Sequence, residues 1–264
     1  MIGLVGDPRD VLRRRASPPD VVVAYGPGAD QVADVRLPAA PDAPATLVVL
    51  LHGGFWRSVY DRVHTRPMAD GLVDAGYAVV MPEYARTGDG GGWPATFDDV
   101  ALALGRLPRL AADLGVDADH VVLVGHSAGG QLALWCAARG LPGPYLGVVA
   151  LAPVADLAEA HRLDLDGGAV AALLGGGPDD LPDRYDAADP CRLPPPELPV
   201  VVVHGSADVE VPTDLSERYA AHAGAGLRIL PGVEHFGLID PRAPAWPAVL
   251  GAVQFVQEGR SPAL

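Results

Sequence analysis

A serine set between two glycines is the residue group with the clearest chemical meaning in this sequence. Residues 125–129 read Gly-His-Ser-Ala-Gly, which places Ser127 at the centre of a G-x-S-x-G pattern. An apolar run at 120–124 precedes the pattern and a helix-forming run at 131–138 follows it. A strand, a sharp turn and a helix in this order project a serine Oγ clear of the sheet. We therefore predict that Ser127 is a nucleophile, against the alternative of an ordinary Gly-rich turn.

A serine hydroxyl needs an adjacent imidazole to take its proton at neutral pH. Among the eight histidines, His235 is the best candidate because it follows the last expected strand in a loop. Open α/β sheets place their sites in the loops at the carboxyl ends of strands. His52 and His126 lie in turns where a positional role is expected, and His204 ends a strand.

The imidazole in turn needs a carboxylate that fixes its tautomer and stabilises the imidazolium. Asp208 lies just past the apolar run at 199–204, so the order along the chain is Ser127, Asp208, His235. This is the order in which one class of α/β enzymes arranges its catalytic triad. Glu210 and Asp240 are the alternatives, and Asp240 follows the histidine instead of preceding it.

An acyl-transfer site also needs two backbone N–H groups directed at the developing oxyanion. One should belong to Ala128, the residue after the nucleophile. The other should come from the segment His-Gly-Gly-Phe-Trp at 52–56, where glycines allow close approach to a substrate. We predict that the amides of Gly54 and Phe55 supply it.

The elements that must position these residues alternate between strands and helices. Apolar runs predict strands at 21–25, 31–37, 46–51, 77–81, 120–124, 146–151, 199–204 and 227–230. Helical spacing predicts helices near 65–75, 97–107, 131–138, 213–222 and 246–256. Thr65 should cap the first of these, and Pro108 should kink or end the second. Alternation of this kind implies a mostly parallel sheet with helices on both faces, and the first two strands should form an antiparallel edge.

Three segments depart from this alternation. Residues 155–190 are rich in Asp and Gly with short helical pieces such as 169–174, and we predict a small lid inserted in a single domain over 1–264. Residues 1–20 should form a mobile arm with some helix. Pro38 to Pro44 should be a loop.

Composition excludes several classes of function. The net charge of −14 argues against binding to nucleic acid or to an anionic membrane surface. The start of the chain lacks the apolar core of a signal peptide, and no run approaches 18 apolar residues, so we expect a cytoplasmic protein. Two cysteines, Cys136 and Cys191, do not make a disulfide framework. The sequence permits a homodimer but does not determine the oligomeric state.

These residues together resemble the α/β-hydrolase fold superfamily across residues 20–257. The segment His-Gly-Gly-Phe-Trp is similar to the H-G-G-x-W signature of kynurenine formamidases (arylformamidases) and related carboxylesterases, and Gly-His-Ser-Ala-Gly-Gly is similar to their nucleophile turn. The resemblance implies an α/β-hydrolase fold and a serine hydrolase. The extra glycine and the Asp before the serine that mark hormone-sensitive-lipase-like esterases are absent.

Aromatic residues near the motifs are candidates for substrate binding. Trp56, Trp93 and Phe236 could line a pocket for an aromatic group, while Trp56 could equally pack beneath the oxyanion loop and Trp93 could anchor the lid. No metal-ligand pattern stands out, and the glycine runs lack the context of a nucleotide site. We therefore expect neither metal nor cofactor.

The sequence thus predicts a serine hydrolase that cleaves a small carboxylic ester or an N-formyl aryl amide with water as acceptor. A biosynthetic thioesterase, cyclase or acyltransferase with the same triad is one alternative. A prolyl-oligopeptidase-like peptidase is disfavoured because no propeller domain precedes the motifs. A non-catalytic ligand-binding protein of the same fold is the alternative from another class.

Overall fold

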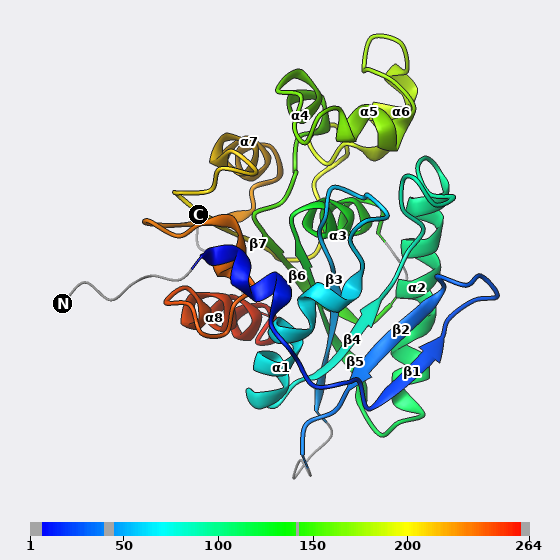
Figure 1. Ribbon diagram of the computed structural model, residues 1–264, viewed down its shortest axis with the longest axis vertical. Helices are drawn as coiled ribbons and strands as arrows, with labels where there is room; N and C mark the ends of the chain where they lie inside the picture. The colour runs from blue at the N-terminus through cyan, green and yellow to red at the C-terminus, as the bar shows by residue number, and fades with distance from the viewer. Residues whose placement is uncertain (1–6, 40–44, 141–142, 260–264) are drawn as a thin grey trace.

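One eight-stranded sheet forms the centre of the molecule (Figure 1). The computed structural model describes residues 7–39, 45–140 and 143–259. Its strands follow the spatial order β1-β2-β4-β3-β5-β6-β7-β8. Their bounds are β1 Val21–Ala24, β2 Val32–Arg36, β3 Thr46–Leu51, β4 Ala78–Pro82, β5 Asp117–His126, β6 Tyr145–Leu151, β7 Val200–Gly205 and β8 Gly226–Leu230. The first two strands pair antiparallel and the remaining six run parallel, which confirms the predicted fold class.

The central strands are apolar along their whole length because both faces of the sheet are covered. In β3, Leu47, Val49 and Leu51 pack on one face while Val48 and Leu50 pack on the other. Helices α2 (Ala95–Ala112), α3 (Ala128–Ala138) and α7 (Thr213–Ala223) contribute to the first of these cores. Helices α1 (Arg66–Asp74) and α8 (Trp246–Gln257) contribute to the second.

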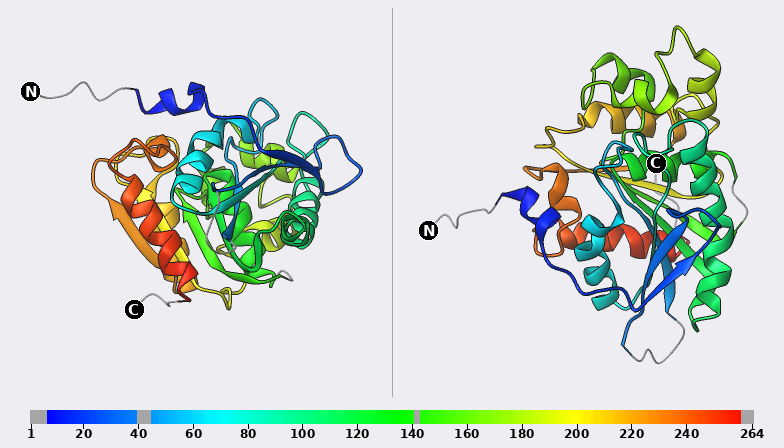
Figure 2. Two further views of the ribbon diagram at one scale, coloured as in Figure 1. Left: turned by 90° about the horizontal axis from the view of Figure 1, so that it is seen from below. Right: turned by 45° about the vertical axis from the view of Figure 1, so that its right-hand side comes forward.

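Three short helices follow β6 in the segment predicted as a lid. They are α4 (Leu157–Arg162), α5 (Ala169–Leu174) and α6 (Pro182–Ala188). They gather at the end of the molecule that lies beyond the carboxyl ends of the parallel strands (Figures 1 and 2). Buried apolar residues such as Leu157, Leu173 and Tyr185 join them to the core on the α3 face. That this segment acts as a lid stays a prediction.

The N-terminal segment is docked where we expected a mobile arm. Residues 1–6 lie outside the described residues, but Pro8–Arg13 form a 3-10 helix, η1, beside the 3-10 helices η2 (Arg62–Thr65) and η3 (His235–Leu238). Val11 is 1% exposed in the α1–α8 core, and Arg14 pairs with Asp240. The expectation was wrong because one buried side chain and one ion pair hold this polar-looking segment to the domain.

Two local predictions need correction in detail: α2 does not end at Pro108, and Thr65 stands at the N-cap position of α1 without capping the helix through its side chain. Helix α2 continues past Pro108 to Ala112, since the carbonyl of Leu104 that loses its helical partner accepts a hydrogen bond of 2.6 Å from the Tyr145 hydroxyl. Thr65 makes no capping hydrogen bond to α1, because its Oγ1 donates to the carbonyl of Arg62 inside η2, which leads directly into the helix. The predicted loop at 38–44 falls mostly outside the described residues.

Candidate active site

Ser127 occupies a strained turn between β5 and α3. Its φ of 56° and ψ of −119° are rare for a residue with a side chain, and the turn directs the chain from strand to helix within one residue. A Cβ at Gly129 would lie 2.2 Å from the carbonyl oxygen of Leu51, and one at Gly125 would lie 2.2 Å from that of Gly129. Both glycines of the motif are therefore required by backbone crowding around Ser127.

His235 and Asp208 come together at the carboxyl ends of β8 and β7. The Nδ1 atom of His235 lies 2.6 Å from Oδ2 of Asp208, as in a charge-assisted hydrogen bond. Both side chains are almost fully buried. This bond fixes the tautomer of His235 and leaves Nε2 for a second partner.

Ser127 and His235 line the same pocket, which Leu12, Phe55 and Phe236 complete on other sides. No hydrogen bond joins Ser127 Oγ to His235, both of which belong to the described part of the chain. Such bonds are often long without substrate and shorten in the reacting complex. The structure thus brings Ser127 and His235 to one pocket, and Asp208 is already bonded to His235 behind it.

The electrostatics of Asp208 favour its ionised form. Burial alone would raise the pKa of Asp208, but hydrogen bonds from His204 and His235 and from the amide of Val211 outweigh burial and hold this pKa well below its ordinary value. Asp208 is therefore a carboxylate across the range in which a histidine base works. It can stabilise a positive charge on His235.

The loop after β3 carries the predicted oxyanion donors. Gly54 and Phe55 have φ of 107° and 48°, so the backbone here takes the left-handed region. At Gly54 a Cβ would lie 2.5 Å from the side chain of Tyr60, which explains why glycine is needed. Within residues 7–39, 45–140 and 143–259, no hydrogen bond engages the amides of Gly54, Phe55 or Ala128. Ala128 begins α3, whose N-terminal end also favours negative charge.

A buried pair of polar residues supports this loop from below. His52 Nε2 lies 2.8 Å from Oε1 of Glu83, its Nδ1 lies 2.8 Å from the carbonyl oxygen of Gly53, and both residues are about 1% exposed. Burial would raise the pKa of Glu83, but the bond from His52, the amide of Arg62 and the charge of Arg86 lower it to about 2. A buried carboxylate thus anchors the ring that precedes the oxyanion loop.

The pocket around Ser127 is small. Its volume is about 60 Å³, and it is lined by Leu12, Gly54, Phe55, Tyr60, His64, His126, Ser127, Asp166, Glu210, His235 and Phe236. Sequence reasoning missed Leu12, Tyr60, His64 and Asp166 as lining residues, because they come from η1, from the segment before α1 and from the insertion. Their sequence neighbourhoods carry no motif that would have marked them.

Charges at the rim of the pocket are paired. Arg57, just after the oxyanion loop, forms an ion pair with Asp166 of the insertion. Arg9 of η1 forms another with Glu210, so Glu210 pairs with an arginine while Asp208 bonds His235. Burial lowers the pKa of His64 to about 4, which keeps that side chain neutral at pH 7. The pocket therefore favours an uncharged group.

Of the three aromatic residues predicted to bind substrate, only Phe236 reaches the pocket. Its ring contacts His235 with centroids 5.0 Å apart. Trp56 is fully buried and donates from Nε1 to Gln131, so it packs beneath the loop and cannot contact substrate. Trp93 stacks edge-on with Phe97, and its amide donates to the carbonyl of Leu173 in α5. Neither tryptophan lines the pocket, and of the two placements considered for each, the structure shows the packing one: Trp56 lies beneath the loop and Trp93 contacts the insertion.

His126 has a supporting position beside the base. Its Nε2 donates to the carbonyl oxygen of His235 over 3.2 Å, and the two rings lie 4.5 Å apart. Burial, with the neighbouring His235, lowers the pKa of His126 well below its ordinary value. His126 is thus a neutral ring that holds the backbone of His235.

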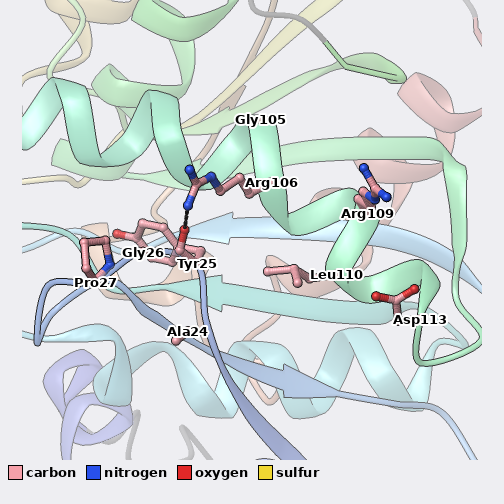
Figure 3. Close-up of a pocket in the computed structure, with 9 residues that line it drawn as sticks. All are labelled: Ala24, Tyr25, Gly26, Pro27, Gly105, Arg106, Arg109, Leu110 and Asp113. Carbon is pink, nitrogen blue, oxygen red and sulfur yellow. Dashed lines mark hydrogen bonds between the residues drawn. The ribbon is translucent and has the colours of Figure 1, made fainter.

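A larger hollow of about 520 Å³ lies elsewhere, between α2 and the β1–β2 turn (Figure 3). Arg106 there donates to the carbonyl oxygen of Tyr25, and Arg109 and Asp113 lie farther along the same helix. The hollow contains no serine, cysteine or histidine and is open to solvent. We therefore do not assign it to the chemistry of Ser127.

Among the described residues, no group of three or more His, Cys, Asp or Glu side chains is arranged to hold a metal ion. A search of the same residues finds no helix with the length and apolarity to cross a bilayer. The two cysteines, Cys136 and Cys191, are free thiols.

Comparison with known proteins shows similarity to esterases. The model of the BD-FAE family matches residues 33–141, a stretch that includes the oxyanion loop and the Ser127 turn. Esterase LipQ from Mycobacterium tuberculosis is 27% identical over 220 residues, which cover 75% of this chain. The chain spans about half (51%) of the length of LipQ. Part of the non-reducing polyketide synthase ausA from Aspergillus calidoustus is 35% identical over 125 residues, covering 42% of this chain and 5% of that protein.

Solved structures share the fold over nearly the whole chain. Esterase B from Lactobacillus rhamnosis superposes with a TM-score of 0.78 at 21% identity, covering 94% of this chain and 90% of that one. A carbohydrate esterase from gut microbiota, in truncated form, gives a TM-score of 0.77 at 19% identity, covering 92% and 99%. The chain has the α/β-hydrolase fold.

Proposed function

We propose that this protein is a serine hydrolase of the carboxylesterase type that cleaves uncharged esters with a small acyl group. One observation carries the proposal: Ser127 stands at a strained strand-to-helix turn and shares a pocket with a His235 ring that is bonded to Asp208 over 2.6 Å. The similarity to LipQ and to structures of esterases supports the same reaction class.

The reaction would proceed through an acyl-enzyme. As Ser127 Oγ attacks the acyl carbonyl, His235 Nε2 takes its proton, and Asp208 remains ionised to stabilise the imidazolium. The amides of Ala128 and of Gly54 or Phe55 would hold the oxyanion. His235 then returns the proton to the leaving alcohol, and a water molecule deacylates Ser127 by the same steps in reverse order.

Pocket size suggests the acyl group. A single water needs about 10–15 Å³ of such space, so a pocket of about 60 Å³ accepts only a handful of non-hydrogen atoms. The paired rim charges and the neutral His64 disfavour a charged acyl group. Acetyl to butyryl esters should therefore be the preferred substrates.

The test is a series of p-nitrophenyl esters from acetate to decanoate, with Ser127→Ala as the control. We expect kcat/KM to be highest for short chains and to fall beyond butyrate. Ser127→Ala should keep the thermal unfolding midpoint within a few degrees and lose turnover by about 10³-fold or more. Undiminished turnover in a folded Ser127→Ala variant would refute the proposal.

An N-formyl aryl amide is the second candidate substrate. The similarity of His-Gly-Gly-Phe-Trp to the formamidase signature favours it, as does a pocket that fits a one-carbon acyl group with Phe55 and Phe236 beside it. N-formylkynurenine assayed beside p-nitrophenyl acetate separates the two substrate classes by their kcat/KM values. If it is inert while acetate esters turn over, the formamidase assignment is wrong and the esterase assignment stands.

Two further alternatives have their own tests. Acyl transfer to an amine or alcohol instead of water would appear as a new acylated product when such an acceptor is added. A silent ligand-binding protein would lack an activated serine and would not react with a fluorophosphonate.

A further inference from the structure

A second histidine contacts the carboxylate of Asp208 from the side opposite the pocket. His204 near the end of β7 places Nε2 3.1 Å from Oδ2 of Asp208 and 3.0 Å from the carbonyl oxygen of Val211. On the other side of the ring, Nδ1 lies 2.7 Å from Oγ of Ser216 in α7. His204, Ser216 and the Asp208 side chain are all fully buried.

The partners of this ring determine where its proton lies. Nε2 faces two oxygens that can only accept, a carboxylate and a carbonyl, so it carries the N–H. Nδ1 pairs with the Ser216 hydroxyl, whose only hydrogen bond among the described residues is this one. His204 is therefore held by a helix on one side and donates to Asp208 on the other.

The acceptor sites of Asp208 are all engaged as a result. Oδ2 accepts from His204 and His235, while Oδ1 accepts from the amides of Glu210 at 2.9 Å and Val211 at 2.8 Å. A carboxylate with one fewer bond could rotate about its Cβ–Cγ bond and shift Oδ2 relative to His235. The two oxygens are fixed because each is held from two directions.

We propose that His204, supported by Ser216, is a positioning residue that fixes the Asp208 carboxylate so that Oδ2 stays on His235. The inference rests on the proposed function, since a rate effect presupposes that Asp208 and His235 work as a pair. His204 does not contact the pocket and acts only through Asp208.

Several charged and titratable groups surround the hydrogen bonds that link His204, Asp208 and His235, and they affect how the rate depends on pH. Asp208 faces both histidines, His126 lies against His235, and the pair of Glu210 and Arg9 lies at the rim of the pocket. Ser216 and the backbone of Val211 complete the surroundings of His204. Removing the N–H of His204 lets the Asp208 carboxylate turn away from His235, which weakens its stabilisation of a protonated His235.

The experiment compares His204→Phe, which keeps the ring size but cannot donate, with His204→Gln, whose amide can place an N–H near the position of Nε2. We expect His204→Phe to lower kcat for p-nitrophenyl acetate by about 10- to 100-fold, the range of one hydrogen bond to a charged group, with KM unchanged within about twofold. The acidic limb of its kcat/KM profile should move to lower pH, because a carboxylate that is no longer fixed on His235 stabilises its protonated form less. His204→Gln should recover most of the rate.

Val202→Ala is the matched control for lost packing. Val202 is a fully buried residue of the same strand, and its truncation destabilises β7 without touching Asp208. We expect a lower unfolding midpoint with kcat and the pH profile unchanged. If His204→Phe does not fold, Ser216→Ala removes the support at Nδ1 and should lower kcat by about 3- to 10-fold with the same KM pattern.

Imidazole N–H resonances of the ¹⁵N-histidine-labelled protein supply a readout without activity. The wild type should show an N–H at Nε2 of His204, and the His235 Nδ1–H signal should shift or broaden in His204→Phe. Equal kcat and an unchanged acidic limb in a folded His204→Phe, or an unchanged His235 signal, would overturn the proposal. If the wild type hydrolyses no ester, the proposed function fails, and the His235 signal alone then decides whether His204 fixes the pair.

Discussion

Glu83 is the residue for which the structure gives the most specific prediction of how the free energy of unfolding depends on pH. Its folded pKa of about 2 lies below the ordinary carboxyl value near 4.5, so the ionised form is favoured by folding. The stability gained is complete above about pH 4.5 and is lost as pH falls through about 2. A shift of this size corresponds to a few kcal/mol.

We therefore predict that Glu83→Gln flattens the acid branch of the stability curve. In urea unfolding, the free energy difference between wild type and variant should be largest at pH 6–7 and should shrink between pH 4.5 and pH 2.5. Because His52 loses its buried partner, kcat should also fall as the oxyanion loop loosens. A difference that stays constant over this range would show that the charge of Glu83 contributes nothing to folding.

At the same scale, sequence reasoning could bring residues together where chemistry restricts the choice of residue. Ser127, Asp208 and His235 could be selected because each role needs one residue type at a strand end, in one order along the chain; in the structure Ser127 and His235 share a pocket and Asp208 bonds His235, while their catalytic roles stay a prediction. For Trp56 and Trp93 the sequence left pocket and packing placements equally open, because an aromatic side chain near a motif packs equally well inward. His204 was taken for a strand end, although its spacing of four residues from Asp208 could have indicated a contact.

A substitution in the turn that carries Ser127 tests how closely β3 and α3 approach each other. In Gly129→Ala the new Cβ would meet the carbonyl oxygens of Leu51 and His52 at 2.2 and 2.4 Å, both of them backbone atoms that cannot move alone. We expect a loss of about 3 kcal/mol or more in the free energy of unfolding.

Gly105→Ala in α2 is the matched control, because its Cβ meets no atom within 4 Å and its backbone is helical. The control should gain about 0.5–1 kcal/mol from helix propensity. Urea denaturation of the two variants measures both effects. Equal stability of the two would contradict the close approach of β3 and α3.

Helix η1 makes a second prediction at this scale, since its Leu12 forms one wall of the pocket. Leu12→Ala should extend the pocket, and the kcat/KM ratio of p-nitrophenyl hexanoate to acetate should rise by about tenfold. Arg13→Ala, an exposed neighbour in the same 3-10 helix, should leave the ratio unchanged. An identical ratio in Leu12→Ala and wild type would place the acyl group elsewhere.

The strands and long helices could be predicted because their periodic patterns are local. What escaped prediction depends on distant partners. Tyr145 lets α2 pass Pro108 by satisfying the carbonyl of Leu104, and Val11 docks η1 by joining the buried apolar cluster to which α1 and α8 contribute. The sequence around α2 gives no indication of the first contact, and the sequence around η1 gives none of the second.

For the whole molecule, the alternation of apolar runs and helical patterns fixed the fold class, since parallel strands covered on both faces admit few topologies. The carboxyl ends of β3, β5, β7 and β8 then converge at one edge, which is why residues 54, 55, 127 and 235 line one pocket and Asp208 reaches His235. The pocket itself could not be predicted, because η1 and the insertion after β6 reach it across the fold.

The measurement that tests the central claim most directly is labelling by a fluorophosphonate, followed by intact mass and peptide mapping. We expect one label per chain, located on Ser127 and absent from a folded Ser127→Ala variant. In His235→Gln the labelling rate should fall by at least about 100-fold, because the base that activates Ser127 is gone. A folded wild type that does not react, or a label on any other residue, would contradict the assignment of Ser127 as the nucleophile activated by His235 and Asp208.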